Sequence, residues 1–314
     1  MIEVLSTGLP NTVQDGGRPG YLSAGVSLSG AMDRPALLAA NALIGNAPNA
    51  AAVEVALFPF RLRFHAETSF AVTGAVAPAT LDGVALPPWW TAHAKAGQEL
   101  RLDRPARGAR AVIAFAGGVD VPLVLGSRAT DLKGGFGGLE GRGLKRGDRL
   151  AVGPAPAVRA REFGTVPDWL HEDWSLLRVL PAAEFDAFDE GSRARFLGQD
   201  WTVSADANRQ GCRLEGGQLT RSSPRELFSH GIMPGTVQVP ASGAPIIQLA
   251  DANTCGGYPK IATVIEADLW KLAQAPVGAK LRFQEATRAE GIAALRAQRE
   301  GLERLRAAVG LVRR

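Results

Sequence analysis

The sequence predicts a mainly β fold, a β-rich α+β protein with few helices. Among its 314 residues, 37 glycines and 20 prolines separate short apolar segments at the intervals expected of strands joined by turns. Such segments include VEVALF, SFAVTG and ARAVIAFAG in the first half, and TVQVP, IATVIE and KLRFQ in the second. Helical signals are confined to three stretches, so β structure is expected to dominate.

Each helix is predicted from its start and stop signals. The first begins at Asp33, a good N-cap, has Pro35 in its first turn and ends near Gly45. A second, shorter helix is expected over 182–198, and a third over 285–309. The apolar stripe of the third consists of Ile292, Leu295, Leu302, Leu305 and Val309. We interpret the third helix as a solvated amphipathic cap, and a helix that binds a partner is the alternative.

The chain is expected to divide near its middle, where the stretch GPAPAVRAREFGTVPDWLHEDW is rich in proline and charge. This boundary predicts an N-terminal β-rich half over 1–170. A second β-rich half should cover 171–285, and the amphipathic helix should occupy 286–314.

Composition argues against several classes of protein. The longest apolar runs are interrupted before the roughly 20 residues that a membrane-spanning helix requires, so no membrane association is expected. The start of the chain does not resemble a secretory signal, and two cysteines form no disulfide framework, so a cytoplasmic location is expected. The formal net charge is +4, but basic residues are dispersed and few aromatic residues accompany them, which disfavours nucleic-acid binding.

The loop from Asn11 to Asp33 is the first candidate site. Gln14, Asp15 and Arg18 lie close together there, and the Arg18 guanidinium suits a carboxylate or phosphate with Asp15 orienting it. The following SGAMD, which contains Ser29, leads into the helix at Asp33, whose N-terminal N–H groups favour an anion. The plainer interpretation is a glycine-proline loop with a surface ion pair.

Two further stretches carry chemistry-bearing residues. KGGFGGLEGRGLKRGDRL, 133–150, satisfies neither a P-loop nor a dinucleotide fingerprint, and is interpreted as a hairpin with tight turns or as a loop that closes over a substrate. SADANRQGCRLEGG places Asn208 and Arg209 beside Cys212. With no histidine nearby, Cys212 is expected to be a buried thiol rather than a nucleophile.

The stretch 229–264 is the densest in polar residues. Its candidates are Gln238, Asp251, Gly256, Gly257, Tyr258 and Lys260, together with His230, Asn253 and Cys255. The glycine pair allows backbone N–H groups to approach a ligand without a Cβ in the way. No metal site is expected, because the four histidines show no ligand spacing with the cysteines.

Seven ordered motifs carry a family resemblance. TVQDGGRPGY, SGAMD, NALIGN, GLEGRGLKRGD, NRQGCRLEG, PGTVQVPASGAPIIQLAD and GGYPKIATV occur in the order and spacing of the biotin-dependent carboxyltransferase-like family. That family includes the C subunit of bacterial 5-oxoprolinase, proteins called allophanate hydrolase subunit 2, and the carboxyltransferase part of urea carboxylase. The resemblance implies one family domain over roughly 24–300. The chain departs from the family pattern at His230, where the family usually has glutamate, and at Cys255.

The resemblance implies a cyclophilin-like β-barrel and an active site shared with a B-type subunit. It also implies an A-type subunit, with ATP used to open 5-oxo-L-proline to L-glutamate. A biotin-dependent carboxyltransferase subunit, which would use biotin, and a non-catalytic regulatory binding protein are the alternatives. The absence of a nucleotide motif suggests that ATP lies at a surface shared with a partner subunit or mainly on that partner.

The chemistry of these substrates suggests roles for the candidates. Both catalytic interpretations involve an amide-like group, whose oxygen gains negative charge during the reaction. N–H groups at Gly256 and Gly257 or the Gln238 amide would stabilise that charge. Arg18 or Lys260 would hold a carboxylate or phosphate oxygen. The remaining role, handling protons or orienting these cations, is open among Asp15, Asp33 and Asp251.

Overall fold

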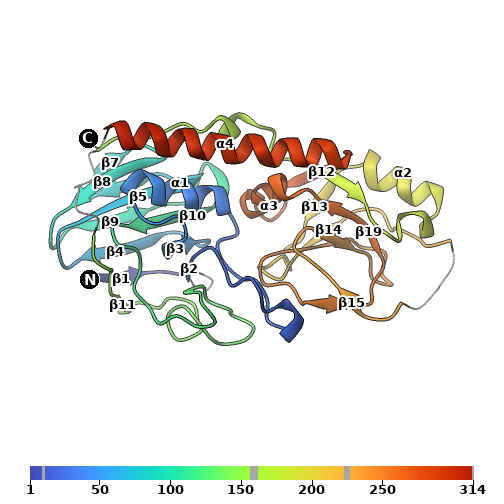
Figure 1. Cartoon of the computed structure of the whole chain (residues 1–314), viewed down its shortest axis with the longest axis horizontal. Helices are drawn as coiled ribbons and strands as arrows, with labels where there is room; N and C mark the ends of the chain where they lie inside the picture. Colours follow the sequence, from blue (N-terminus) through green and yellow to red (C-terminus); the bar gives the residue numbers. More distant parts are fainter. Residues whose placement is uncertain (9–10, 156–161, 223–226, 313–314) are drawn as a thin grey trace. The chain divides into compact units, whose positions relative to one another are not determined.

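The computed structural model describes residues 1–8, 11–155, 162–222 and 227–312. The chain forms two compact units (Figure 1). The first consists of Met1–Arg18, Ser29–Leu170 and Arg299–Arg314, and the second of Pro19–Leu28 and His171–Gln298. The sequence-based division at 170 and 285 stays a prediction. The structure adds that a short segment near the N-terminus belongs with the second unit.

The first unit contains two antiparallel sheets. One has the strand order β11 (Arg149–Leu150), β1 (Ile2–Ser6), β4 (Phe60–Phe64), β9 (Glu99–Leu102), β6 (Ala79–Leu81) and β7 (Val84–Leu86). The other has the order β2 (Thr12–Gln14), β3 (Ala52–Val55), β10 (Arg107–Phe115), β5 (Thr68–Val76) and β8 (Trp90–Ala94). Neighbouring strands are antiparallel throughout both sheets.

The core of the first unit lies between these sheets. In β4, Phe60, Leu62 and Phe64 are buried while the residues between them are more exposed, which is the alternation of a half-covered strand. One hydrophobic cluster joins these residues to others from the second sheet, and the rings of Phe64 and Phe70 stack with centroids 5.1 Å apart. The sheets therefore pack face to face.

Helix α1 (Arg34–Ile44) covers the second sheet. The Asp33 carboxylate accepts from the N–H of Ala36 at 2.9 Å, and Gly45 ends the helix at φ 72°, as the sequence predicts. The helix contacts β5 and β10 (Figure 1), and the Thr73 hydroxyl donates to the Ala36 carbonyl at 2.9 Å. The helix thereby fixes the chain that leads to it from the first candidate loop.

The second unit is built on a closed seven-stranded barrel. Its order is β12 (Leu176–Pro181), β19 (Lys260–Val264), β16 (Thr236–Gln238), β17 (Ile246–Gln248), β14 (Gly211–Glu215), β13 (Trp201–Val203) and β20 (Lys280–Glu285). Strands β12 and β20 are parallel and the other pairs are antiparallel. A separate two-stranded ribbon joins β15 (His230–Gly231) and β18 (Cys255–Gly256). The sheets, the barrel and the scarcity of helices confirm the predicted fold class.

Apart from the long C-terminal helix, the remaining helices are short. The short ones are α2 (Glu190–Gly198), α3 (Leu269–Gln274), and the 3₁₀ turns η1 (Leu22–Ala24), η2 (Asp168–His171), η3 (Phe185–Ala187) and η4 (Glu266–Asp268). The predicted helix over 182–198 is divided, because extended Phe188 pairs with Arg221 and Asp189 then caps α2.

The C-terminal helix α4 (Arg288–Val312) starts with a capping box, in which Thr287 and Glu290 bond to each other's backbone N–H. Of the predicted stripe, Leu302 and Val309 are buried whereas Ile292 is 43% exposed. Of the helices that the structure describes, none combines the length and hydrophobicity needed to cross a membrane.

Candidate functional site

The predicted site residues fall into two groups, one in each unit. In the first unit, the Asp15 carboxylate is 6% exposed and accepts three hydrogen bonds. Its donors are the N–H of Gly17 at 2.8 Å, the hydroxyl of Ser127 at 2.7 Å and the N–H of Arg128 at 2.6 Å. Asp15 thus ties the first glycine-rich loop to a segment more than a hundred residues away.

Arg18 is buried in the same region, at 1% exposure. Its Nη2 donates to the Ala129 carbonyl, and its guanidinium lies 4.8 Å from the centre of the Phe136 ring. A Cβ on Gly137 would come within 2.8 Å of the Arg18 Nη2. The glycine-rich stretch predicted as a hairpin or closing loop therefore packs around Arg18.

The hairpin predicted over 133–150 is wrong in its pairing, although the turn at Gly147 forms, at φ 89°. β11 after this turn pairs with β1 rather than with a strand of the same stretch. The surface ion pair expected between Asp15 and Arg18 is also wrong. Both side chains are buried, and the Asp15 carboxylate is occupied by Gly17, Ser127 and Arg128.

The other predicted residues of the first unit are also buried. The Gln14 Nε2 donates to the Thr12 hydroxyl at 2.9 Å and the Thr130 carbonyl at 3.1 Å. Ser29 adopts a left-handed conformation, at φ 50°, directly before Gly30. A Cβ on Gly30 would lie 2.7 Å from the Gly17 nitrogen, so the two glycine turns touch. Asp33 caps α1, as described above.

In the second unit, Gln238 presents an amide donor that no described residue accepts. The side chain is 3% exposed, and its Oε1 accepts from Gln248 Nε2 at 2.9 Å. Its Nε2 is buried, finds no acceptor among the described residues and points at Gly256, 2.9 Å from where a Cβ would stand. Buried amide donors are normally satisfied, so this nitrogen marks a position where a ligand oxygen would be stabilised.

Lys260 lies directly opposite Gln238 where β16 and β19 pair. It is 9% exposed, and no described residue accepts a hydrogen bond from its ammonium group. Burial lowers the pKa of Lys260 below its ordinary value of 10.5, and the charge of Glu184 opposes that shift. The pairing of β16 with β19 therefore brings an amide donor, on Gln238, opposite a cationic donor, on Lys260.

Glu184 connects this group to His230. Its Oε2 accepts from the backbone N–H of Lys260 at 3.0 Å, and its Oε1 lies 3.9 Å from the His230 Nε2. His230 in turn pairs with Gly256 across the β15–β18 ribbon. Glu184 is not among the residues predicted from the sequence, because nothing local indicates a contact that spans 76 residues.

Arg209 and Asp251 form a buried bidentate ion pair. Arg209 Nε lies 2.9 Å from Asp251 Oδ2 and Nη2 lies 3.1 Å from Oδ1, at exposures of 6% and 2%. The pair lies beyond the Gly211–Gln248 end of the β14–β17 pairing, and the Gln248 side chain at that end donates to the Gln238 amide oxygen. Asn208 is exposed, and its Oδ1 accepts from the N–H of Gln210 at 2.8 Å. These three residues are placed to hold the turn before β14.

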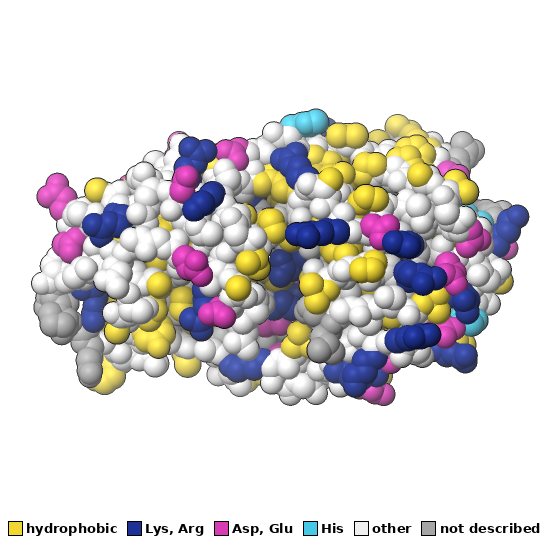
Figure 2. Space-filling view, turned by 180° about the vertical axis from the view of Figure 1, so that it is seen from behind, with side chains coloured by type: hydrophobic (Ala, Val, Ile, Leu, Met, Phe, Trp, Pro, Cys, Tyr) yellow, Lys and Arg dark blue, Asp and Glu magenta, His cyan; other side chains and the backbone are white. Residues whose placement is uncertain are grey.

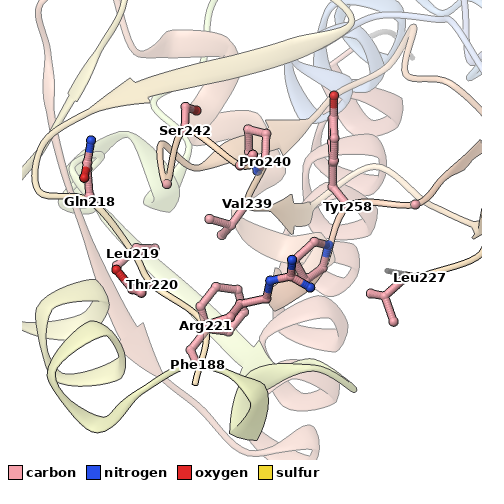
Figure 3. Close-up of a pocket in the computed structure, with 14 residues that line it drawn as sticks. Phe188, Gln218, Leu219, Thr220, Arg221, Leu227, Val239, Pro240, Ser242 and Tyr258 are labelled. Atoms are coloured by element: carbon pink, nitrogen blue, oxygen red, sulfur yellow. The ribbon is translucent and has the colours of Figure 1, made fainter. Parts of the chain in front are cut away.

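Gly257 and Tyr258 line a cavity of about 550 Å³ (Figure 3). Tyr258 is 52% exposed at its rim.

Cys212 is buried, as predicted, whereas Cys255 is exposed on β18. In the described residues no group of three or more His, Cys, Asp or Glu side chains could hold a metal ion. Figure 2 shows Lys and Arg interspersed with acidic and apolar side chains over the face that it presents.

The chemistry of the two groups differs. The barrel group offers donors to an oxygen that carries or gains negative charge. The first-unit group instead consists of side chains whose polar atoms hold loops together, and among them the Arg18 guanidinium donates to the Ala129 carbonyl beside the Phe136 ring. Arg221, which lines the cavity, is not among the site residues predicted from the sequence. The signals for that cavity are the turn motifs VPASG and GGYP, whose residues form two of its walls.

Comparison with known proteins gives consistent results. A family described as carboxyltransferase domain, subdomain A and B, matches residues 24–285. The chain is 45% identical over 306 residues to the C subunit of 5-oxoprolinase from Escherichia coli strain K12, covering 97% of each chain. It is 41% identical to the C subunit of 5-oxoprolinase from Haemophilus influenzae, covering 96% of each.

A solved structure of the urea amidolyase of K. lactis superposes with a TM-score of 0.89 at 30% identity. The match covers 97% of this chain and 20% of that one. The urea amidolyase of Saccharomyces cerevisiae is 32% identical over 90% of this chain and 16% of its own. The chain therefore resembles one portion of these much longer enzymes.

Proposed function

Because the chain belongs to the family of the carboxyltransferase domain, subdomain A and B, we propose that it is the C subunit of an ATP-dependent 5-oxoprolinase. In this proposal it acts with A-type and B-type subunits to open 5-oxo-L-proline to L-glutamate. The likeness to two proteins named as 5-oxoprolinase C subunits, which extends over nearly the whole of both chains, supports this choice. A cytoplasmic location belongs to the proposal, since neither cysteine is in a disulfide.

The observation that carries the chemistry is the donor pair formed by Gln238 and Lys260. A lactam is a neutral amide whose oxygen gains negative charge when the carbonyl is activated. The Gln238 Nε2 is a buried donor, and Lys260, opposite it on the neighbouring strand, adds a cationic donor, so the two together stabilise that charge. In this role Glu184 holds the backbone of Lys260, and its charge opposes the lowering of the Lys260 pKa by burial.

Other predicted residues have different roles in this proposal. Asp15 and Arg18 fix the glycine-rich loops of the first unit rather than moving protons. Arg209 and Asp251 neutralise each other and hold the turn before β14. ATP is used by the complex and shared with a partner subunit.

The proposal is tested by reconstitution. The full-length chain is mixed with its A-type and B-type partners, 5-oxo-L-proline and ATP, and glutamate release is measured. We expect release to depend on all three proteins and on ATP. Lys260→Met should abolish most of it, whereas Lys280→Met, at an exposed lysine on β20 of the same barrel, should leave it unchanged. Full activity of the Lys260→Met complex would remove the lysine from the mechanism.

A second candidate function is supported by the likeness to urea amidolyase, at a TM-score of 0.89. A biotin-dependent carboxyltransferase subunit would present the same donors to the ureido oxygen of biotin. The same preparation distinguishes the two functions. Turnover that requires a biotin carrier protein and a biotin carboxylase, with no glutamate release from 5-oxo-L-proline, would favour the second function over the first.

A further inference from the structure

A closed ring of contacts in the second unit links the donor pair to an imidazole and a carboxylate. Gln238 and Lys260 pair where β16 meets β19, and the Lys260 backbone N–H donates to Glu184 Oε2 at 3.0 Å. Glu184 Oε1 lies 3.9 Å from His230 Nε2, and His230 pairs with Gly256 across the ribbon of β15 and β18. The Gln238 amide points at Gly256 and closes the ring.

His230 and the Gln238 amide nitrogen lie on the same face of this ribbon. Residues directly opposite each other on antiparallel strands direct their side chains to one face, with Cβ positions about 4.5–5.5 Å apart. His230 is opposite Gly256, and the Gln238 Nε2 stands 2.9 Å from the position of a Cβ on that glycine. Because Gly256 has no side chain, nothing from it separates the imidazole from the amide donor.

The tautomer of the imidazole is fixed by the backbone. His230 Nδ1 lies 2.9 Å from the Phe228 carbonyl oxygen, which can only accept a hydrogen bond, so Nδ1 carries a hydrogen and donates it. In the neutral ring Nε2 therefore has a lone pair and can take a proton. The side chain is 40% exposed, so a ligand can reach this nitrogen.

Glu184 favours the imidazole in its protonated form. At 3.9 Å, Glu184 Oε1 is too far from His230 Nε2 for a hydrogen bond, so the carboxylate does not occupy that nitrogen. An opposite charge within about 4–6 Å nevertheless stabilises the charged form of a titratable group. A base whose other nitrogen is held by a hydrogen bond, and whose cation is stabilised nearby, is suited to general acid–base catalysis.

His230 has other titratable or charged neighbours. Lys260 acts against protonation of the imidazole, because both cations would share the Glu184 carboxylate. Cys255 pairs with Gly231, the residue after His230, and so points to the opposite face of the ribbon. The other groups on adjoining segments are Tyr258 and Arg221, which line the cavity.

We propose that His230 is a catalytic acid–base residue for opening the lactam, a role that rests on the proposed function. Its Nε2 takes a proton from a water molecule while the water oxygen bonds to the carbonyl carbon of the ring. The ring C–N bond then breaks, its electron pair stays on nitrogen, and Nε2 gives the proton to that nitrogen. His230 ends the step neutral, and Gln238 and Lys260 hold the carbonyl oxygen throughout.

Steady-state kinetics of the reconstituted three-subunit complex test this proposal. A base must be neutral to act, so kcat of the unmodified complex should rise with pH between about 5 and 8, the range in which histidine titrates. His230→Gln cannot titrate, and should lower kcat by about 10²- to 10⁴-fold and remove that rise. The matched control is His171→Gln, at an exposed histidine of η2, which should change neither.

Two further variants separate catalysis from a structural role. His230→Glu restores a base whose ordinary pKa is lower than that of histidine, so it should recover part of the lost kcat and move the rise to lower pH. Glu184→Gln keeps an acceptor for the Lys260 N–H but removes the charge that stabilises the imidazolium, so the rise should again move to lower pH. A residue that only supports the fold would produce neither shift.

The proposal is overturned if His230→Gln keeps the kcat and the pH profile of the unmodified complex, if His230→Glu is no more active than His230→Gln, or if Glu184→Gln leaves the profile in place. Absence of glutamate release from the unmodified complex would remove the proposed function and this step together. Release that His230→Gln leaves unchanged would remove only the role of His230 and keep the proposed function.

Discussion

The side-chain nitrogen of Gln238 lies 2.9 Å from the point that a Cβ on Gly256 would occupy. The glycine therefore leaves room for the amide to stand against the ribbon of β15 and β18. The Gln238 amide is oriented by the hydrogen bond that its oxygen accepts from Gln248, which leaves the buried nitrogen directed at the glycine. The position of the proposed oxygen-binding donor thus depends on the absence of one methyl group.

Gly256→Ala is expected to lower glutamate release by about 10- to 100-fold, because the added methyl group displaces the Gln238 amide and misplaced catalytic groups cost rates of this order. The fold should persist, since the atom met is the end of a side chain. The matched control is Gly231→Ala on the partner strand, where a Cβ would meet nothing within 4 Å. Equal activity of the two variants in the reconstituted complex would contradict this role for the amide.

Gln238→Glu removes the donor and keeps the acceptor that bonds to Gln248. If the amide stabilises developing charge, kcat should fall by about 10²- to 10³-fold, the usual effect of losing one such donor. Gln284→Glu makes the same chemical change at an exposed position on β20 and should be neutral. The measurement is steady-state kinetics with partners present, and a change confined to KM would indicate uniform binding instead.

Local signals explain why so much of the fold follows from the sequence. Asp33, Pro35 and Gly45 specify α1 because capping, first-turn geometry and a left-handed end act within a few residues. The same reasoning fails over 182–198, where the pairing of Phe188 with Arg221 interrupts a helical pattern. That pairing depends on where a distant segment lies, which no local propensity encodes.

The candidate site shows the same limit. Gln238 and Lys260 are identified as polar residues in a motif, but their burial and opposition follow from the register of β16 and β19. The surface ion pair expected for Asp15 and Arg18 was wrong because the carboxylate is bonded to Ser127, 112 residues away. Polar residues in glycine-rich loops can bind ligands or other loops, and only the contacts distinguish these uses.

The stability of the chain should depend on the titration of Lys260. Burial lowers its pKa in the folded chain, so between that pKa and the unfolded value of 10.5 the unfolded chain binds more protons. Stability contributed by this residue therefore rises with pH through that window. Urea unfolding of the unmodified chain and of Lys260→Met should give a free-energy difference that shifts in favour of the unmodified chain as pH approaches 10.5. Parallel curves would show that the ammonium is not buried.

The Arg209–Asp251 pair should be costly to break and cheap to replace as a whole. Asp251→Ala leaves a buried guanidinium without its carboxylate and is expected to destabilise the chain by about 3–5 kcal/mol. The double variant Arg209→Met with Asp251→Leu should recover most of this loss. Asp103→Ala, which breaks an exposed pair with Arg101, should cost about 0–1 kcal/mol. Chemical denaturation measures all three, and a double variant no better than Asp251→Ala would refute the charge argument.

Gly137 and Gly135 form a matched pair for testing the packing around Arg18. Both have a left-handed conformation, at φ 70° and 68°. A Cβ on Gly137 would lie 2.2 Å from the Ala129 carbonyl oxygen and 2.8 Å from the Arg18 Nη2, whereas one on Gly135 would meet nothing within 4 Å.

Gly135→Ala should therefore cost only the conformational strain, about 1–2 kcal/mol. Gly137→Ala adds an overlap with backbone that cannot move aside cheaply, so its loss of unfolding free energy should exceed that of Gly135→Ala by at least about 1–3 kcal/mol, the usual cost of overpacking. Thermal or urea unfolding measures the difference. Gly137 lies against the Arg18 guanidinium, which donates to the Ala129 carbonyl. If Gly137→Ala and Gly135→Ala lost the same unfolding free energy, the 133–143 loop would not hold Arg18 in place.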